Sequence, residues 1–372
     1  SGRSFQLNDR IGRSADWLGW ERQRVRLPSI AQRGRGPPSH MKLILTPHIA
    51  ETYAAALRDV APGLEVVTVD DGHAWHGDPS DAEAAYLSFD MYPSGVVNTV
   101  LEALPQLPGL RWIHTYSIGV DHPMYLPIVE RGLTFTNGAT SQSIPIAQHI
   151  LLMMLHHAKR MDVWERAQAR REWTHAPSAE LTGKTVALFG LGGIGQEVAR
   201  LAKAFRMRVI GLRRRPEPVA DVDEILPPDA VGELCAQADF LVICAPLTRT
   251  TRGAIGAAEI ARMRPSAYLI NVARGPIVDE AALVSALREG RIAGAALDVF
   301  EVEPLPAEHE LWSLLNVIIT PHTAPASPLH IHRGTELFLE NLRRYTAGDP
   351  LLNIVDPADV GVAEAARVWK ET

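Results

Sequence analysis

From Met41 onward, short apolar runs alternate with longer stretches in which apolar residues recur every three or four positions. The short runs are bounded by turn-forming residues and are typical of buried strands, whereas the longer stretches are typical of helices packed on a sheet. Strands are predicted at 42–47, 64–69, 85–89, 111–117 and 133–137, and helices at 94–107 and 124–132. This alternation predicts a parallel sheet with helices on its faces.

A long, largely apolar helix predicted over 143–161 separates this series from a second one. Further strand-like runs lie at 184–190, 208–212, 240–246, 267–273, 294–300 and 316–322, and a last helix is predicted over 328–345. Ligands of open α/β sheets bind outside the carboxyl ends of the strands. Polar residues just after these runs are therefore the first candidates for a functional site.

The first forty residues follow neither pattern. They lack sustained periodicity and end in "QRGRGPPSH" (32–40), so we expect residues 1–40 to be a leader or an upstream extension that is poorly ordered. They contain no apolar stretch of the kind found in a secretory signal. They are rich in arginine, whereas the whole chain of 372 residues has a net charge of −6. The remainder is therefore acidic, which disfavours a nucleic-acid partner.

Composition narrows the class of protein further. Hydrophobic residues make up 46% of the chain, but no apolar run approaches the roughly 20 residues of a membrane span. The two cysteines, Cys235 and Cys244, cannot form a disulfide framework, so we expect a cytoplasmic protein in which both are small buried side chains. Neither a CxxC nor an HExxH pattern is present, so we expect no metal site.

The segment "ALFGLGGIGQEVARL" (187–201) joins a predicted strand to a predicted helix through a glycine-rich turn. Gly190, Gly192 and Gly195 form the pattern GxGxxG, in which the first glycine permits a tight turn. The second lets the backbone approach a pyrophosphate, and the third lets the helix pack closely on the strand. The N–H groups at the start of the helix then face the phosphates. The segment therefore predicts a dinucleotide site.

The next strand ends in a run of cations. Leu212 closes the strand, and Arg213, Arg214 and Arg215 follow it within "RVIGLRRRPEP" (208–218). An acidic residue at this turn binds the ribose 2′-hydroxyl of NAD, whereas an arginine accommodates the 2′-phosphate of NADP. The planar guanidinium pairs well with phosphate oxygens. The sequence therefore predicts a preference for NADP, with NAD as the alternative.

Three segments that follow later strands carry groups for hydride transfer. Arg274 lies in "LINVARGPIVDE" (269–280), and His322 lies in "NVIITPHTAP" (316–325). Asp298, Glu301 and Glu303 lie in "GAALDVFEVEPLP" (294–306). In such a site a cation binds a substrate carboxylate and polarises the adjacent carbonyl, while a histidine supported by a carboxylate delivers a proton.

Together these segments resemble the D-2-hydroxyacid dehydrogenase family. Three further segments fit the same family, namely "WIHTYSIGVDH" (112–122), "ELTGKTV" (180–186) and "CAPLTRTTRG" (244–253). The resemblance extends over nearly the whole chain from Met41. The run of arginines is similar to that of the NADP-preferring glyoxylate/hydroxypyruvate reductase branch.

The resemblance implies a role for each matching residue. Arg274 would bind the carboxylate and carbonyl of a keto acid, and Glu303 and His322 would form the acid–base pair. Ile118 and Gly119 would offer backbone N–H groups to the substrate carboxylate. The implied cofactor-binding residues are Gly190, Gly192, Gly193, Ile194, Gly195, Leu212, Arg213, Arg214, Arg215, Pro246, Thr251, Val272, Ala273, His322 and Asp298, the last of which would contact the nicotinamide carboxamide.

The family also implies an architecture. We expect an α/β fold of two Rossmann-like or flavodoxin-like domains with parallel sheets. The substrate domain would be discontinuous, formed by 41–141 and 326–372, and the dinucleotide-binding domain would span 142–325. A homodimer is expected.

A second "TPH", at 46–48, has no Arg or Glu companions, and we interpret His48 as a turn residue.

The predicted function is the NADPH-dependent reduction of a small 2-keto acid, such as glyoxylate, hydroxypyruvate or phenylpyruvate, to a D-2-hydroxy acid. One alternative is an NAD-linked D-2-hydroxyacid dehydrogenase whose arginines only face solvent. Another is a nucleotide-sensing binding protein, because the family includes transcriptional corepressors. The pocket that selects the keto acid is not defined by the sequence, and its candidates are 90–92, 112–116 and Trp173.

Overall fold

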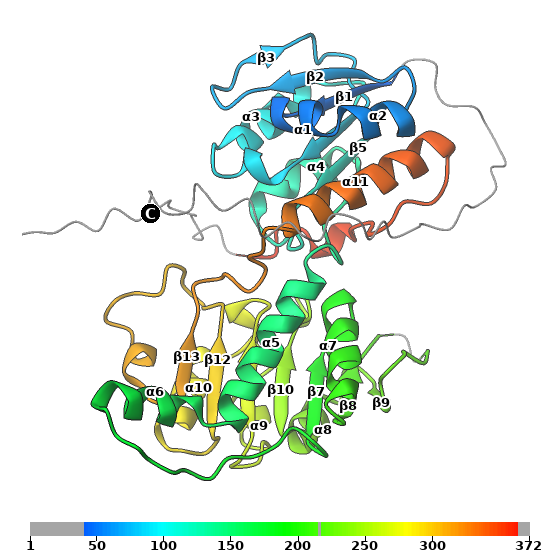
Figure 1. Cartoon of the computed structure of the whole chain (residues 1–372). Helices are drawn as coiled ribbons and strands as arrows, with labels where there is room; N and C mark the ends of the chain where they lie inside the picture. Colours follow the sequence, from blue (N-terminus) through cyan, green and yellow to red (C-terminus); the bar gives the residue numbers. More distant parts are fainter. Residues whose placement is uncertain (1–40, 215–216, 364–372) are drawn as a thin grey trace, which may run out of the picture. The chain divides into compact units, whose positions relative to one another are not determined.

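The computed structural model of the chain describes residues 41–214 and 217–363. The expectations for residues 1–40 and for Arg215 lie outside this part. The described residues form two α/β units, each built on its own sheet (Figure 1). The predicted fold class is confirmed.

The first sheet has the strand order β3-β2-β1-β4-β5-β6. Its strands are β1 Lys42–Leu45, β2 Glu65–Val69, β3 Trp75–His76, β4 Ala84–Leu87, β5 Trp112–Thr115 and β6 Thr134–Thr136. All neighbouring strands pair in parallel except β2 and β3. The strands β1, β4, β5 and β6 each lead into helical segments, as the alternating sequence pattern predicts.

Helices cover both faces of this sheet because successive strand residues point to opposite sides. On one side, Ile44 and Leu87 pack with α3 (Val96–Ala103) and α4 (Leu126–Glu130). On the other side, Leu43 and Tyr86 pack with α1 (Pro47–Thr52), α2 (Ala54–Val60) and α11 (His330–Ala347). The Phe338 ring of α11 stacks on that of Tyr86, with 4.2 Å between the ring centroids. The last long helix therefore belongs to the core of the first unit.

The second sheet has the order β13-β12-β11-β10-β7-β8-β9, and all its neighbouring strands are parallel. Its strands are β7 Thr185–Phe189, β8 Arg208–Leu212, β9 Glu224–Leu226, β10 Phe240–Ile243, β11 Tyr268–Asn271, β12 Gly294–Leu297 and β13 Val317–Ile319. The chain runs outward from β7 to β9 and then returns to β10, beside β7. The strand order thus reverses between β7 and β10, and such a reversal is where doubly wound folds bind dinucleotides.

Alternate residues of the second sheet also enter two different cores. Val186 and Leu188 of β7 pack with α5 (Ser143–Ala158) and α7 (Gly193–Ala204). Ala187 and Phe189 face the opposite layer. This opposite layer consists of α8 Val231–Gln237, α9 Ala257–Ile260 and α10 Glu280–Arg288. A further helix, α6 Met161–Arg170, follows α5 along the chain. Short 3-10 segments lie at Phe89–Met91, Leu104–Gln106, Pro123–Tyr125, Gly275–Ile277, Glu310–Ser313 and Pro357–Asp359.

Two local predictions were wrong, and two short strands were missed. The helix expected over 143–161 ends at Ala158, because Arg160 adopts a left-handed conformation with φ of 55° before α6 begins. His48 is not a turn residue but an exposed residue of α1, whose N-cap Thr46 accepts a hydrogen bond from the Ile49 N–H. The short strands β3 and β9 were not predicted.

Within the described residues, no helix combines the length and apolar character that crossing a membrane requires.

Candidate functional site

The glycine loop joins β7 to α7, and three of its amides have no acceptor among the described residues. Gly190 has φ of 116°, and a Cβ atom there would lie 2.8 Å from the backbone of Ala245. A Cβ atom on Gly195 would lie 2.2 Å from the Gly190 carbonyl oxygen, so helix and strand pack as closely as only glycine permits. Within the described residues, the N–H groups of Gly192, Gly193 and Ile194 donate to no protein atom. Such amides at a helix start form an anion site.

Arg213 follows β8 and is held loosely. Its Nη1 donates to the Glu217 carbonyl oxygen at 3.2 Å, and its Nη2 lies 3.9 Å from the Glu217 carboxylate. Its side chain is 30% exposed, and Arg214 is exposed. A surface pair at this distance contributes little free energy. Both arginines can therefore turn toward a phosphate group at little cost.

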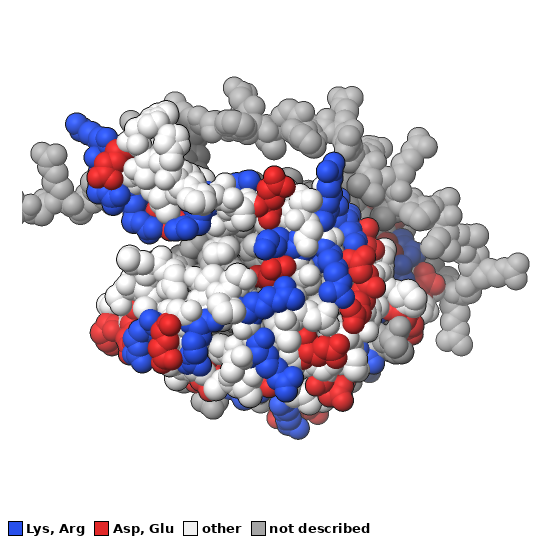
Figure 2. All heavy atoms as spheres, turned by 90° about the horizontal axis from the view of Figure 1, so that it is seen from below, with Lys and Arg blue, Asp and Glu red and all other residues white. Residues whose placement is uncertain are grey.

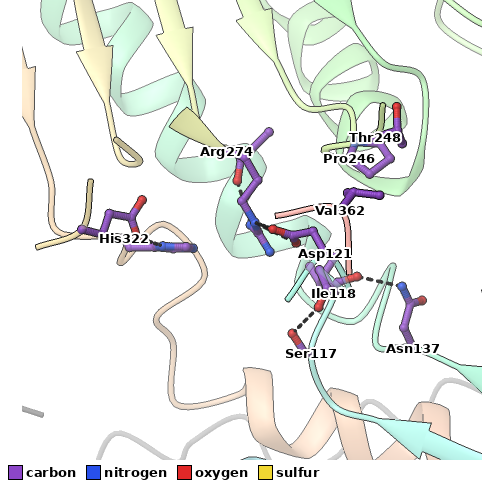
Figure 3. A network of polar contacts seen from close by, with 12 residues as sticks. Ser117, Ile118, Asp121, Asn137, Pro246, Thr248, Arg274, His322 and Val362 are labelled. Atoms are coloured by element: carbon purple, nitrogen blue, oxygen red, sulfur yellow. Dashed lines mark hydrogen bonds and ion pairs between the residues drawn. The ribbon is translucent and has the colours of Figure 1, made fainter. Parts of the chain in front are cut away.

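The turn after β10 carries Pro246 and Thr251, which contact each other. The Thr251 hydroxyl donates to the Pro246 carbonyl oxygen at 2.7 Å, and Thr248 lies beside Pro246 in Figure 3.

Cys244, at the end of β10, donates from its thiol to the Gly190 carbonyl oxygen at 3.1 Å. Burial raises the pKa of the Cys244 thiol to about 12, so this thiol stays protonated at neutral pH. Both cysteines are free and buried, as the sequence predicts.

Arg274 follows β11 and reaches across to the loop after β5 (Figure 3). Its Nε donates to both carboxylate oxygens of Asp121, at 3.0 and 3.2 Å, and its Nη1 donates to the Ala273 carbonyl oxygen at 2.7 Å. Burial disfavours the charged guanidinium, but the negative charge and hydrogen bond of Asp121 outweigh it, so the pKa of Arg274 lies above its ordinary value. Arg274 is thus a fixed cation.

Four consecutive carbonyl groups of the loop after β5 each accept a hydrogen bond. The carbonyl oxygens of Ile118 and Gly119 accept from the Asn137 amide at 2.7 Å and the Ser117 hydroxyl at 2.9 Å (Figure 3). Those of Val120 and Asp121 accept from the backbone N–H groups of residues 361 and 363, at 3.2 and 2.8 Å.

Two amide groups of the same loop differ from these carbonyl groups. The N–H groups of Ile118 and Gly119 donate to no atom of the residues that the structure describes. A Cβ atom on Gly119 would lie 1.6 Å from Nη2 of Arg274, so the guanidinium rests directly against this glycine. The loop therefore brings unused N–H donors next to a fixed cation, which is an arrangement suited to a carboxylate ligand.

His322 lies in the loop after β13 and is paired with Glu303. The imidazole Nδ1 is 2.8 Å from Oε2 of Glu303, and Oε1 of the same carboxylate accepts from the Phe300 N–H at 2.9 Å. An ionised carboxylate only accepts hydrogen bonds, so Nδ1 carries a proton and Nε2 lies on the opposite side of the ring. The two side chains are 22% and 18% exposed. Glu301, the other acid of this segment, is exposed.

Asp298 organises the loop that carries His322. Its buried carboxylate accepts from the Thr320 hydroxyl at 2.5 Å and from the N–H groups of residues 323 and 324, both at 2.9 Å. Its carbonyl oxygen accepts from the His322 N–H at 2.8 Å. His322 has φ of 51°, a left-handed conformation that costs a non-glycine residue roughly 1 kcal/mol. Hydrogen bonds on both sides of His322 thus hold it in a strained conformation.

Two residues of the predicted substrate-selecting segments differ in burial. Trp112 is fully buried and donates from Nε1 to the Thr136 hydroxyl at 2.8 Å, so it belongs to the core of the first unit. Trp173 is 94% exposed. Sequence reasoning also missed Asp121, Asn137 and Ser117. Asp121 lies inside the segment 112–122 that carries the family resemblance, but only the folded chain brings its carboxylate to Arg274.

Figure 2 shows one face of the molecule, on which basic and acidic side chains are interspersed, whereas a duplex-binding face gathers cations. Among residues 41–214 and 217–363, no three His, Cys, Asp or Glu side chains gather in an arrangement that could hold a metal ion.

Fold and site together define a class of protein. An all-parallel sheet with a glycine loop at its reversal point is a dinucleotide-binding unit. The Arg274 guanidinium and the His322–Glu303 pair follow strands of the same sheet, at their carboxyl ends. These are the groups of a nicotinamide-dependent oxidoreductase.

Comparison with known proteins gives the family. Residues 151–324 match the model of the D-isomer specific 2-hydroxyacid dehydrogenase family, NAD binding domain. The chain is 36% identical over 257 residues to a glyoxylate reductase of Thermococcus gammatolerans. The aligned residues cover 67% of this chain and 77% of that protein.

Solved structures agree with this match. A D-isomer specific 2-hydroxyacid dehydrogenase from Xanthobacter autotrophicus Py2, in complex with NADPH and MES, superposes with a TM-score of 0.71 at 33% identity, over 86% of this chain and 99% of that one. An NADPH-dependent glyoxylate/hydroxypyruvate reductase from Sinorhizobium meliloti, in complex with NADP and sulfate, gives a TM-score of 0.70 at 27% identity, over 87% and 99% of the two chains.

The chain belongs to the D-isomer specific 2-hydroxyacid dehydrogenase family. It is accordingly an NAD(P)-dependent oxidoreductase.

Proposed function

We propose that this protein reduces a small 2-keto acid to the D-2-hydroxy acid with NADPH as the hydride donor. One observation supports this proposal: the structure combines three groups that keto-acid reduction uses. They are a cation fixed at Arg274, the unused N–H groups of Ile118 and Gly119 beside it, and the His322–Glu303 pair. Relatives named glyoxylate reductase and glyoxylate/hydroxypyruvate reductase support small keto acids as the substrates.

In this proposal the protein binds the substrate through its carboxylate. The N–H groups of Ile118 and Gly119 and the guanidinium of Arg274 receive the carboxylate oxygens, and Arg274 also polarises the adjacent carbonyl. A polarised carbonyl carbon accepts hydride more readily, because the developing oxyanion is stabilised by the cation. Preformed donors of this kind need little rearrangement when substrate binds.

His322 supplies the proton. As hydride reaches C2, the carbonyl oxygen takes the proton from Nε2 of protonated His322, and the products are the hydroxy acid and the oxidised cofactor. Glu303 accepts from Nδ1, which fixes the plane of the ring and stabilises the imidazolium. Bound nicotinamide cofactor supplies the hydride, and the chain itself binds, orients and protonates the substrate.

The cofactor is proposed to lie across the carboxyl ends of β7 and β10. Gly192, Gly193 and Ile194 would bind the pyrophosphate through their N–H groups, and Arg213 and Arg214 would bind the 2′-phosphate of NADPH. The other proposed cofactor contacts are Gly190, Gly195, Leu212, Pro246, Thr251, Val272, Ala273, Asp298 and His322. Two solved relatives contain NADPH or NADP, which supports this preference.

A homodimer is part of the proposal. The exposed apolar side chains of the second unit include Ile144 and Leu152 on α5 and Met161 on α6, which are 37%, 56% and 40% exposed. Apolar side chains that recur along neighbouring helices are typical of an interface. Sedimentation equilibrium tests this, and a monomer at micromolar concentration would contradict it.

The experiment that tests the function follows the oxidation of reduced nicotinamide by the purified protein. Glyoxylate, hydroxypyruvate and phenylpyruvate are each combined with NADPH and with NADH. Turnover with a clear preference for NADPH is the expected result. Turnover with NADH alone would overturn the proposed cofactor, and cofactor binding without any turnover would overturn keto-acid reduction and favour a nucleotide-sensing protein.

A further inference from the structure

The hydrogen bonds of Arg274 leave part of its guanidinium available to a ligand. A guanidinium carries five N–H groups. The Nε–H donates to Asp121, and one Nη1–H donates to the Ala273 carbonyl oxygen. Among the described residues, no other atom accepts a hydrogen bond from the guanidinium of Arg274. Three N–H groups, one on Nη1 and two on Nη2, therefore remain for a substrate.

Asp121 contacts one nitrogen of Arg274 and not the pair that a substrate would use. Its two oxygens converge on Nε, at 3.0 and 3.2 Å. A carboxylate that binds arginine most strongly bridges two nitrogens instead. Asp121 therefore holds the guanidinium from its Nε side, and none of the described residues accepts a hydrogen bond from Nη2. On its other side, Nη2 lies against Gly119, which carries one of the unused N–H groups.

The backbone that carries Asp121 is itself fixed. Its carbonyl oxygen and that of Val120 accept from the N–H groups of Ala363 and Gly361, at 2.8 and 3.2 Å. The Val362 carbonyl oxygen in turn accepts from Nη2 of Arg252 at 2.9 Å. The Asp121 side chain is only 10% exposed. A carboxylate on a backbone anchored in this way can hold a long, flexible side chain in a single orientation.

We propose that Asp121 is the positioning residue that holds the substrate-binding guanidinium of Arg274 in the orientation needed for hydride transfer. The proposal rests on the proposed function for the identity of the substrate. Because the Asp121 carboxylate cancels positive charge at Arg274, it does not increase the affinity for an anion. Asp121 instead restricts the orientation of the Arg274 guanidinium. This restriction affects the rate of the chemical step more than the affinity for substrate.

This reasoning predicts a split between binding and turnover. Without Asp121, the site has more positive charge and still attracts a carboxylate, but the guanidinium no longer points at the carbonyl oxygen. For Asp121→Ala we expect kcat to fall by about 30-fold or more, while KM for glyoxylate changes by less than about threefold. Asp121→Asn keeps an amide oxygen that accepts from Nε, so its kcat should lie between those of Asp121→Ala and the wild type.

The experiment uses the full chain and a matched control. Asp239 is also a nearly buried carboxylate, 13% exposed, and it lies near Lys184 and Arg264 at 3.5 and 3.7 Å, just before the amino end of β10. Asp239→Asn should keep kcat near the wild-type value. NADPH binding, followed by fluorescence, and oxamate binding to the NADPH complex are measured for all variants. Both Asp121 variants should bind NADPH and oxamate within about threefold of wild type.

Three results would overturn the proposal. One is that both Asp121 variants keep kcat within threefold of the wild type. Another is that oxamate affinity falls in parallel with kcat, because Asp121 would then serve binding. The third is that Asp121→Asn loses NADPH binding, because Asp121 would then stabilise the fold. If Asp121→Ala alone fails to fold, the kcat and the binding affinities of the isosteric Asp121→Asn variant test the proposal.

A separate measurement distinguishes this proposal from the proposed function. The Nε–H of Arg274 gives a proton–nitrogen NMR signal that Arg274→Lys identifies by its loss. We expect this proton to exchange with solvent about tenfold faster or more in Asp121→Ala than in the wild type or Asp239→Asn. A wild-type protein that reduces no keto acid but shows this difference would overturn the function alone. Normal turnover with equal exchange would overturn the role of Asp121 alone.

Discussion

The imidazole Nδ1 of His322 lies 2.8 Å from Oε2 of Glu303. The other oxygen of that carboxylate is held by the Phe300 N–H at 2.9 Å, so one side chain connects the loop after β12 to the loop after β13. Glu303 thereby sets both the tautomer of His322 and the direction in which Nε2 points. A proton donor oriented before substrate binds is what keto-acid reduction requires.

Glu303→Gln tests this connection. The amide keeps the shape of the side chain but loses the charge that stabilises the imidazolium, so kcat should fall by about two orders of magnitude. Steady-state kinetics with NADPH and glyoxylate measure the change. Glu301→Gln, two positions earlier and exposed, is the control and should keep kcat. Equal kinetics for both variants would rule out Glu303 as the partner of His322 in catalysis.

Gly119→Ala tests the contact between the loop after β5 and Arg274. The added methyl group would lie 1.6 Å from Nη2 of Arg274 and 2.8 Å from Oδ1 of Asp121, so the guanidinium must move. We expect kcat/KM to fall by about 100-fold or more, with NADPH binding retained. Gly256→Ala is the control, because its Cβ atom would lie 3.4 Å from its nearest neighbour, with φ of −98°. Unchanged kinetics for Gly119→Ala would contradict the arrangement.

Arg213→Asp tests the cofactor preference. Loss of charge-assisted contacts to the 2′-phosphate should lower kcat/KM for NADPH by one to two orders of magnitude, or roughly 1.4–2.8 kcal/mol. NADH lacks this phosphate, so its kcat/KM should fall much less. Arg208→Gln, at the start of the same strand and paired with Glu224, is the control. Equal losses with both cofactors would exclude a role for Arg213 at the 2′-phosphate.

His114 links stability to pH. It is fully buried, and burial lowers its pKa to about 3. Unfolding therefore takes up a proton below the pKa of an exposed histidine, near 6.5. The stability that His114 contributes is complete above about pH 6.5 and is lost as the pH falls from there toward 3, by about 1.4 kcal/mol per pH unit.

Urea unfolding of wild type and His114→Phe between pH 7 and 4.5 measures this loss. The variant should lose less free energy of unfolding over this range than the wild type. Leu43→Ala removes core packing without removing a titratable group, so its curve should run parallel to that of the wild type. A wild-type curve parallel to that of His114→Phe would contradict a neutral buried imidazole.

Most of the fold could be predicted from the sequence because its strands are buried on both faces and read as continuous apolar runs. The strands β3 and β9 could not be, since two or three residues carry no detectable period. The end of α5 was missed because Lys159 and Arg160 continue a helical pattern. No glycine or proline at Arg160 indicates the left-handed backbone conformation that ends the helix.

The candidate site was predictable where chemistry follows a strand within one segment, as at Arg274, Glu303 and His322. Asp121 was not, because its role arises from a contact between positions 153 residues apart. The two C-terminal N–H groups that anchor this loop, those of Gly361 and Ala363, also carry no sequence signal. Such relationships depend on tertiary structure and not on local pattern.

The most direct test of NADPH-dependent keto-acid reduction follows the hydride itself. Purified protein is incubated with hydroxypyruvate and NADPH that carries deuterium at both positions of C4, and the product is analysed by mass spectrometry and chiral chromatography. We predict D-glycerate with one deuterium at C2 from the wild type, and almost none from His322→Asn. Oxidation of NADPH without deuterated glycerate, or formation of the L-isomer, would contradict the proposed reaction.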